Sequence, residues 1–597
     1  MSTAILTGQP VPGSSIEGDL RSLGFDVQVA ADAADAERLV AEAPCDQRVA
    51  LVDARFVGHV HALRLGLTDP RFSLAALPGA VTAQPDGRVA LTRVLARENS
   101  AGGGTAVAVD SLPDRIVTAL AEDGAEVYRP ELGSLVAAVP ADPQARNEAR
   151  QAVADVDDEA VRLKSAVKSR DGFFTTYCIS PYSRYIARWC ARRGLTPNQV
   201  TTASLITALI AAACAATGTR GGFVAAGVLL IASFVLDCTD GQLARYSLQY
   251  STLGAWLDAT FDRAKEYAYY AGLALGAARS GDDVWALALG AMILQTCRHV
   301  VDFSFNEANH DATANTSPTA ALSDKLDSVG WTVWLRRMIV LPIGERWAMI
   351  AVLTAVTTPR ITFYVLLVGC AFAATYTTAG RVLRSLTRKA QRTDRAAQAL
   401  ADLADNGPLV QALARILRGN GPHLAPLSAA VGGGIVVAGA WAWGSGWWVV
   451  LMAGTYVLLS AEAVSRPLKG ALDWLVPPLF RAAEYGTVLI LAAKADVNGA
   501  LPAAFGLVGA VAYHHYDTVY RIRGNAGAPP AWLVRAVGGH EGRTLLVTVL
   551  AALLTASQFT VALTVLAVAV ALLVLVESIR FWVSAGAPAV HDEGEPA

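Results

Sequence analysis

The chain has 597 residues, of which 53% are hydrophobic and only 17% are charged. It is too long for one compact domain, and its charged fraction lies below the roughly 25% of soluble proteins, so a wholly water-soluble protein is excluded. The formal net charge of −2 gives no reason to expect a nucleic-acid partner. The 7 cysteines form no C-x-x-C pair, which argues against a zinc site and a disulfide framework.

Residues 1–160 alternate short β-rich runs with runs of helical character. Strands are expected at 4–8, 26–30 and 48–54, with helices at 16–24 and 34–43 between them. This rhythm predicts an α/β domain. A glycine run at 102–104, a strand at 105–110 and a helix at 112–124 are expected to follow.

Residues 161–195 are expected to lead from this domain to the membrane. Within them, the run 181–194 places aromatic and aliphatic side chains at helical spacing, with arginines between them. Such a run is typical of a helix that lies on the membrane surface.

Apolar stretches then recur in two groups, 196–390 and 421–597, separated by a polar, basic linker at 391–420. Each group is expected to contain about six spans, although several stretches are shorter than the roughly 20 residues that a bilayer requires. The first group lies near 198–217, 221–240, 257–277, 283–303, 346–358 and 361–381. The second lies near 424–443, 447–464, 477–494, 498–516, 543–556 and 558–577.

Lysine and arginine are concentrated at 164–193 and 381–392, on either side of an even number of expected spans. Because cytosolic segments are enriched in these residues, both segments are assigned to the cytosol. The sequence therefore predicts an integral protein of a bacterial-type plasma membrane, with the active site and both termini facing the cytosol.

The segment 237–262 contains four aspartates at fixed spacing. Asp237 and Asp240 are three residues apart, and Asp258 and Asp262 are four apart, so each pair shares one face of a helix. Two antiparallel helices would direct all four carboxylates at one place. Unpaired carboxylates are costly at a membrane boundary, and hard oxygen ligands suit Mg²⁺ or Mn²⁺. The segment therefore predicts a metal site of the kind used in phosphoryl transfer.

Smaller features of the segment fit a phosphate ligand. Gly241 lets a nucleotide approach the backbone closely, and Arg245 can pair with phosphate. Gly254 permits close packing of the second helix on the first. The competing interpretation is that the four acids cap helices or pair with arginines.

This pattern, Asp237-x2-Asp240-Gly241-x2-Ala244-Arg245-x8-Gly254-x3-Asp258-x3-Asp262, resembles the signature of the CDP-alcohol phosphotransferase family at every fixed position. The resemblance implies an all-α, six-helix membrane domain at 196–390. It implies two metal ions, held by the four aspartates around a CDP diphosphate. Asp262 would also be the catalytic base that deprotonates an acceptor hydroxyl, which attacks the β-phosphate while CMP leaves.

The resemblance also assigns nucleotide contacts to Gly241, Ala244, Arg245 and Ser251. A second family segment, P-N-x-x-T, is present at 197–201 and adds Asn198 and Thr201. Taken alone this segment is a weak signal, because proline at the first position of a helix is common.

The approach segment 163–201 resembles the entry to di-myo-inositol-phosphate-phosphate synthases, in which the transferase is fused to an N-terminal cytidylyltransferase. Residues 1–160 lack the arginine-bearing glycine-rich loop and the Pro-Lys pair of sugar nucleotidyltransferases. A degenerate, regulatory domain is therefore expected, and a domain that still makes a CDP-alcohol is the alternative. The donor stays open between the CDP-diacylglycerol and CDP-inositol types.

Charged residues near the motif have two interpretations. Lys265 and Glu266 are adjacent on a helix, so only one of them is expected to face the site. Arg298, His299 and Asp302 are candidates either for contact with an anionic acceptor or for pairing within the protein.

Residues 421–597 resemble a decayed copy of the first group of spans. The aligned pairs of segments are 256–275 with 474–493, which share Arg-Ala-x-Glu-Tyr, and 344–356 with 541–553. Asp258 and Asp262 fall against Val476 and Phe480, so this half is expected to bind no metal and to be catalytically inactive. Chance similarity between apolar helices is the alternative.

The expected partners are a CDP-alcohol donor, an alcohol or sugar-phosphate acceptor, membrane lipids and, in a homodimer, a second copy of the chain. The competing class is a non-catalytic membrane scaffold or a transporter, which the additional spans suggest. Transporters place polar, broken helices near the middle of the membrane, whereas these acids lie toward helix ends. The sequence therefore favours an enzyme.

Overall fold

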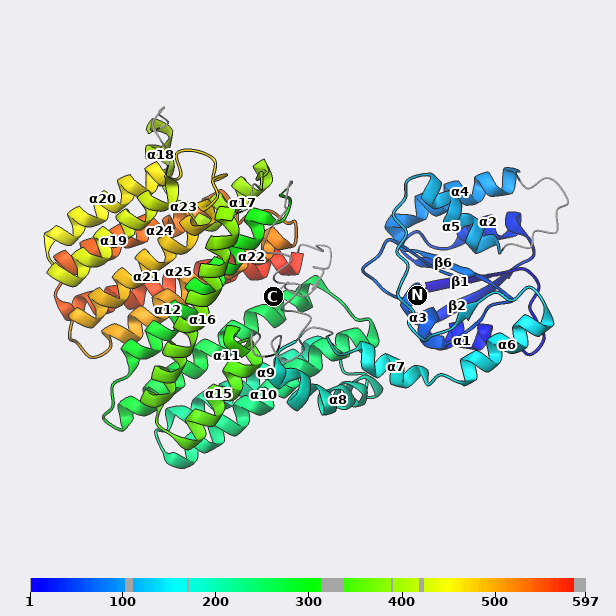
Figure 1. The fold of residues 1–597 in the computed structure, drawn as a ribbon, viewed down its shortest axis with the longest axis horizontal. Coiled ribbons are helices and arrows are strands. Elements are labelled where there is room, and N and C mark those ends of the chain that lie inside the picture. The colour runs from blue at the N-terminus through cyan, green and yellow to red at the C-terminus, as the bar shows by residue number, and fades with distance from the viewer. Residues whose placement is uncertain are drawn as a thin grey trace. The chain divides into compact units, whose positions relative to one another are not determined.

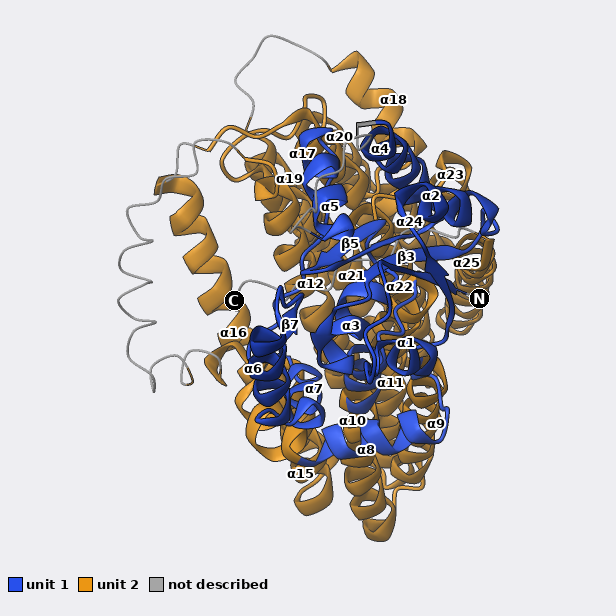
Figure 2. Ribbon diagram, turned by 90° about the vertical axis from the view of Figure 1, so that its right-hand side faces the viewer, with its two compact units in different colours: residues 1–169, 182–197, 239–251 blue, residues 170–181, 198–238, 252–597 orange. Residues whose placement is uncertain are grey.

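The computed structural model describes residues 2–101, 111–168, 171–312, 334, 338–387, 390–417 and 424–584. The glycine run at 102–104 and the strand expected at 105–110 lie outside the described residues. The chain forms two compact units, which Figure 2 shows in different colours. The first comprises residues 1–169, 182–197 and 239–251, and the second comprises residues 170–181, 198–238 and 252–597.

A five-stranded mixed sheet organises the first unit, in the order β2-β1-β3-β6-β5. Its strands are β1 (Ser2–Thr7), β2 (Phe25–Ala30), β3 (Arg48–Asp53), β5 (Leu74–Leu77) and β6 (Ala80–Ala83). β1 pairs parallel with β2 and β3, whereas β6 is antiparallel to β3 and β5. The parallel strands are joined through α1 (Ile16–Ser22) and α2 (Ala33–Glu42), because a parallel pair requires a crossover connection.

Helices cover both faces of this sheet (Figure 1). Leu51 of β3 packs with α2, α4 (Arg88–Ala101) and α5 (Leu112–Glu122). Its neighbour Val52 packs instead with α1 and α3 (Val60–Leu67). Successive side chains of a strand point to opposite faces. Helices packed on both faces of the sheet therefore make a three-layer α/β sandwich, which confirms the predicted α/β region.

Sequence reasoning missed the hairpin of β5 and β6. Its strands are short and alanine-rich, and alanine is depleted in strands. The usable signal was the Pro78–Gly79 pair between them, since Gly79 adopts a positive φ of 77° at the turn. A second small pairing joins β4 (Val57–Gly58) to β7 (Ala137–Ala138).

Three further helices complete the approach to the membrane region: α6 (Pro143–Ala154), α7 (Asp158–Ser165) and α8 (Ser180–Arg192). On α8, the side chains of Tyr182, Tyr185 and Trp189 are exposed. Exposed aromatic residues interleaved with arginines are the distribution expected of a helix on a membrane surface.

The second unit is helical (Figure 1). Its N-terminal half contains a π-helical turn (Thr175–Ile179), α9 (Pro197–Ala216), α10 (Arg220–Ser247), α11 (Thr252–Arg279), α12 (Trp285–Asn309), α15 (Ile343–Val356) and α16 (Pro359–Thr387). Its C-terminal half contains α17 (Asp394–Ala404), α18 (Pro408–Ile416), α19 (Ala425–Trp443), α20 (Trp447–Ala463), a short 3₁₀ turn (Asp473–Leu475), α21 (Val476–Lys494), α22 (Ala500–Arg523), α23 (Ala531–Val537), α24 (Gly539–Leu553) and α25 (Ala556–Ser584). The C-terminal end of α10 belongs to the first unit.

Each expected span coincides with one of these helices. Within the described residues, 6 helices are long and apolar enough to cross a membrane: Pro197–Ala216, Arg220–Ser247, Pro359–Thr387, Ala425–Trp443, Asp473–Lys494 and Ala556–Ser584. The other expected spans are short or carry polar and charged side chains. The expected linker at 391–420 is not a plain connection, because α17 lies within it and buries Leu400 and Leu403.

The two halves of the second unit contain the same ion-pair arrangement. In the first, Glu266 accepts from Arg346 Nε at 2.9 Å and from Arg263 Nη1 at 3.2 Å. In the second, Glu484 accepts from Arg543 Nε at 2.6 Å and from Arg481 Nη1 at 2.8 Å. These residues occupy matching positions in the alignment proposed from the sequence, which favours a repeat over chance similarity.

Glycine allows close packing between α9 and α11. A Cβ atom at Gly272 would collide with the Ala212 carbonyl, and one at Gly276 would collide with the Ala215 carbonyl. The two glycines are one helical turn apart, so they form a flat stripe of the small-xxx-small kind found between membrane helices. The stripe fixes how α11, which carries two of the aspartates, lies against its neighbour.

We predict that Gly276→Ala lowers stability by about 1–3 kcal/mol, because the added methyl group forces the two backbones apart. Gly290→Ala on α12 is the matched control, since its Cβ would meet only Leu367 Cδ2 at 3.8 Å. The midpoint of thermal unfolding in detergent, followed by tryptophan fluorescence, should fall for the first variant and not for the second. Equal midpoints would show that the stripe does not set the packing.

Candidate active site

The turn between α10 and α11 brings two helices of the motif together. α10 ends at Ser247, after which Leu248 takes a left-handed conformation with φ 53°. The Gln249 N–H donates to the Ala244 carbonyl at 3.0 Å. Both features are typical of a helix C-terminus. The chain then reverses over a few residues, and α11 begins at Thr252.

Three of the predicted aspartates form a cluster. One carboxylate oxygen from each of Asp237, Asp240 and Asp258 lies within 4.8 Å of the others. Asp240 is buried, and the other two are half-buried. Carboxylate oxygens in this arrangement are the ligands that Mg²⁺ and Mn²⁺ prefer. The donor set therefore fits a divalent cation.

The fourth aspartate, Asp262, makes a different contact. Its Oδ1 lies 3.0 Å from Nζ of Lys265, one helical turn further along α11. The same ammonium also pairs with Oδ1 of Asp237. Lys265 therefore links Asp262 to the three-carboxylate cluster through a bridging positive charge.

The structure decides which of two adjacent charged residues faces the aspartates. Lys265 faces them, and Glu266 faces the other way, toward Arg346 and Arg263. Tyr270 Oη also donates to Glu266 Oε1 at 2.6 Å. Glu266 is thus part of the frame that holds α11, not of the site. Sequence reasoning expected only one of the two to face the site and could not choose between them.

Polar residues near the end of α12 are paired within the protein. Asp302 pairs with Arg381, and Arg298 donates to a backbone carbonyl of residue 340. The His299 ring nitrogen Nδ1 is hydrogen-bonded to Tyr516 Oη at 2.6 Å. The contacts of His299 and Asp302 favour the structural interpretation for these two residues. The Nε and Nη1 atoms of the buried Arg298 have no hydrogen-bond partner among the described residues, so contact with an anionic acceptor stays open for Arg298.

The residues predicted to contact a nucleotide lie along the C-terminal end of α10 and in the turn after it. Gly241 has only the Arg245 guanidinium near its Cα, at 3.5 Å from an added Cβ. Ala244 and Arg245 are half-buried, and Ser251 is exposed. Asn198 and Thr201 lie in the first turn of α9, with Thr201 buried.

The connector α7 holds this end of α10. Arg245 Nε donates to the Ala166 carbonyl at 2.6 Å, and Arg162 Nε donates to the Tyr246 carbonyl at 2.8 Å. Tyr246 Oη donates to Glu159 at 2.9 Å. Burial lowers the pKa of Arg162 to about 10. Arg245 and Tyr246, which follow Asp240 within the motif, are therefore fixed by the segment that leads from the α/β domain.

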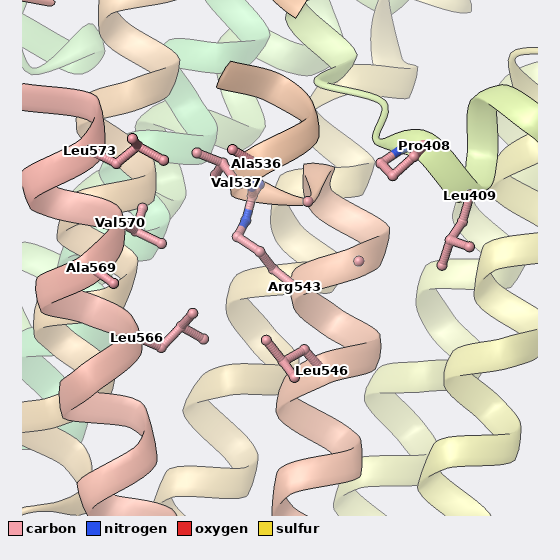
Figure 3. Close-up of a pocket in the computed structure, with 12 residues that line it drawn as sticks. Pro408, Leu409, Ala536, Val537, Arg543, Leu546, Leu566, Ala569, Val570 and Leu573 are labelled. Carbon is pink, nitrogen blue, oxygen red and sulfur yellow. The ribbon is translucent and has the colours of Figure 1, made fainter. Parts of the chain in front are cut away.

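A separate pocket of about 260 Å³ lies in the C-terminal half (Figure 3). One side of the pocket is formed by α25, through Leu566, Ala569, Val570 and Leu573, which face α24 and α23. Arg543 of α24 is the charged residue of the lining. None of its lining residues comes from α10 or α11. The pocket therefore does not belong to the aspartate cluster.

Two family models match the chain. Residues 194–374 match the family described as CDP-alcohol phosphatidyltransferase, and residues 394–597 match DUF5941, described as a family of unknown function. The first match covers the helices that carry the four aspartates. The second begins at the N-terminus of α17 and covers the half that lacks them.

Curated relatives match the same region. A phosphatidylinositol phosphate synthase of Streptomyces avermitilis is 34% identical over 131 residues, which cover 21% of this chain and 51% of the relative. An archaetidylinositol phosphate synthase of Pyrococcus horikoshii is 30% identical over 113 residues, covering 19% and 58%. A bifunctional IPC transferase and DIPP synthase of Aquifex aeolicus is 31% identical over 114 residues, covering 19% and 26%.

The chain thus spans between 26% and 58% of the length of these relatives. The match to the family model and the aspartate pattern fall on the same helices, α10 and α11. Residues 194–374 are therefore similar to the CDP-alcohol phosphatidyltransferase family.

Proposed function

We propose that this protein transfers a phospho-alcohol group from a CDP-alcohol to an acceptor hydroxyl and releases CMP. The observation that carries the proposal is the cluster of Asp237, Asp240 and Asp258, whose oxygens lie within 4.8 Å of one another. Three clustered carboxylates on the helices of a membrane protein are stabilised by a divalent cation and have no comparable use in a scaffold.

The cation is Mg²⁺ or Mn²⁺, held by these carboxylates. When bound, it supplies charge stabilisation for the diphosphate oxygens of the donor. Arg245 and the half-buried Gly241 are one turn apart on α10, where they can bind the diphosphate. The sequence led us to expect two such ions, with Asp262 as the fourth carboxylate ligand.

Asp262 is the proposed base. It accepts the proton of the acceptor hydroxyl, whose oxygen then forms a bond to the β-phosphorus. The bond from that phosphorus to the oxygen bridging it to the α-phosphate breaks, and CMP leaves with the electron pair. The ion pair with Lys265 keeps Asp262 ionised and therefore able to accept the proton.

The acceptor we favour is an inositol phosphate, with CDP-diacylglycerol or a CDP-inositol as donor. Support comes from three relatives whose names refer to inositol phosphate or to IPC and DIPP synthesis. The concentration of cations at 164–193 and 381–392 supports a cytosolic position for the site and for both termini. The α/β domain is proposed to be accessory, and the second half catalytically inactive.

Removing one carboxylate should weaken metal binding. We predict that Asp258→Asn lowers the affinity for Mn²⁺ at least about tenfold. Mutating a residue that only hydrogen-bonds to a metal ligand already lowers metal affinity by about that factor, and Asp258 is proposed to be a ligand itself. The decrease is measured by titrating the free-ion electron paramagnetic resonance signal. Asp283→Asn, an exposed residue before α12, is the charge-matched control and should bind as the wild type does. Unchanged affinity in Asp258→Asn would remove the cluster from the proposal.

Removing the base should abolish turnover without unfolding the protein. We predict that Asp262→Asn lowers the rate of CMP release about 10²–10⁴-fold, the usual contribution of general base catalysis. Purified protein in detergent is assayed with Mg²⁺ and CDP-diacylglycerol or CDP-inositol. The acceptors are radiolabelled inositol phosphate, glycerol phosphate and inositol. Near-normal turnover in Asp262→Asn would show that another group takes the proton, and absence of CMP with every wild-type pair would contradict the transfer.

A further inference from the structure

The ammonium of Lys265 occupies a site with three acceptors. It pairs with Oδ1 of Asp237, lies 3.0 Å from Oδ1 of Asp262, and donates to Ser204 Oγ at 3.2 Å. Hydrogen bonds to Ser204 and Asp237, together with the ion pair to Asp262, therefore place the ammonium among α9, α10 and α11.

The surrounding helices hold these acceptors in place. Ser204 Oγ donates to the Ser233 carbonyl at 2.8 Å, and Ser233 Oγ donates back to the Ser204 carbonyl at 2.8 Å. This reciprocal pair joins α9 to α10 directly behind the ammonium. The Lys265 side chain is 0% exposed, and its Nζ lies 5.4 Å from the centre of the Trp347 ring. The lysine side chain is thus buried in the helix interface.

The position of this ammonium bears on the number of metal ions. In the two-ion site expected from the sequence, Asp262 is the carboxylate outside the three-aspartate cluster, and Asp237 is the cluster member that shares the Lys265 ammonium with it. The Lys265 ammonium lies between these two carboxylates already. A divalent ion added there would be repelled strongly by a positive charge a few ångströms away, and the low dielectric of the interior strengthens that repulsion.

We propose that this chain holds one divalent cation, at Asp237, Asp240 and Asp258, and that the Lys265 ammonium takes the place of the second. This inference rests on the proposed function and revises the two ions that sequence reasoning expected. The fixed ammonium supplies the second positive charge at the site. The ammonium also orients the Asp262 carboxylate, because Lys265 and Asp262 are three residues apart on α11 and their side chains meet on one face of the helix.

The test is the stoichiometry of Mn²⁺ binding to the full chain in detergent, measured by calorimetry and by electron paramagnetic resonance. The wild type is expected to bind one Mn²⁺ and to give the spectrum of an isolated ion. Lys265→Ala removes the ammonium and leaves space between Asp237 and Asp262. It is expected to bind two ions and to show the spin coupling of neighbouring Mn²⁺ ions.

The matched control is Lys469→Ala, which removes a lysine that is 42% exposed and pairs with Asp394 on the surface. It should bind one ion, as the wild type does. Two tightly bound ions in the wild type would overturn the proposal, and this measurement decides even if Lys265→Ala does not fold.

The remaining outcomes are also distinct. One ion in both the wild type and a folded Lys265→Ala would show that the lysine does not take the place of a second ion, which overturns its assigned role. No Mn²⁺ bound to the wild type would instead overturn the metal-dependent function proposed above. Failure of the inference and failure of the proposed function therefore give different ion counts.

Discussion

The repulsion between the carboxylates that α10 and α11 bring together is the constraint on which the rest of the site depends. Asp237, Asp240 and Asp258 lie within 4.8 Å of one another, and Asp262 joins them through Lys265. In a partly buried place such a concentration of negative charge persists only when cations offset it. Lys265, held by Ser204, supplies part of that charge from within the chain, and the remaining requirement is the affinity for a divalent ion. Metal binding and the packing that holds Lys265 in place thus both offset the same carboxylate repulsion.

The aspartate site could be located from the sequence because helix geometry determines which side chains share a face. Spacings of three and four residues place Asp237 with Asp240, and Asp258 with Asp262, wherever those segments are helical. Sequence reasoning could not choose between Lys265 and Glu266, since that choice depends on where Arg346 and Ser204 lie, far away in the chain. It also missed β5 and β6, whose alanine-rich strands are stabilised by pairing with β3 more than by their own preference.

The repeated ion-pair arrangement separates what the helical fold requires from what the chemistry requires. Glu266 with Arg346 and Arg263 in the first half corresponds to Glu484 with Arg543 and Arg481 in the second. Breaking such a buried pair leaves an uncompensated charge and costs several kcal/mol, so both halves retain it. Asp258 and Asp262, in contrast, correspond to Val476 and Phe480 in the second half, both of which are buried apolar side chains.

The hydrogen bond from Arg245 to the Ala166 carbonyl makes the connector a competitor for the same guanidinium that a phosphate would use. A ligand that draws Arg245 away must give up that bond, and a connector that releases it makes the arginine available. Thermodynamic linkage makes such competition reciprocal. Under the proposed function, a change in order along α7 would then alter the affinity of Arg245 for the diphosphate of the donor.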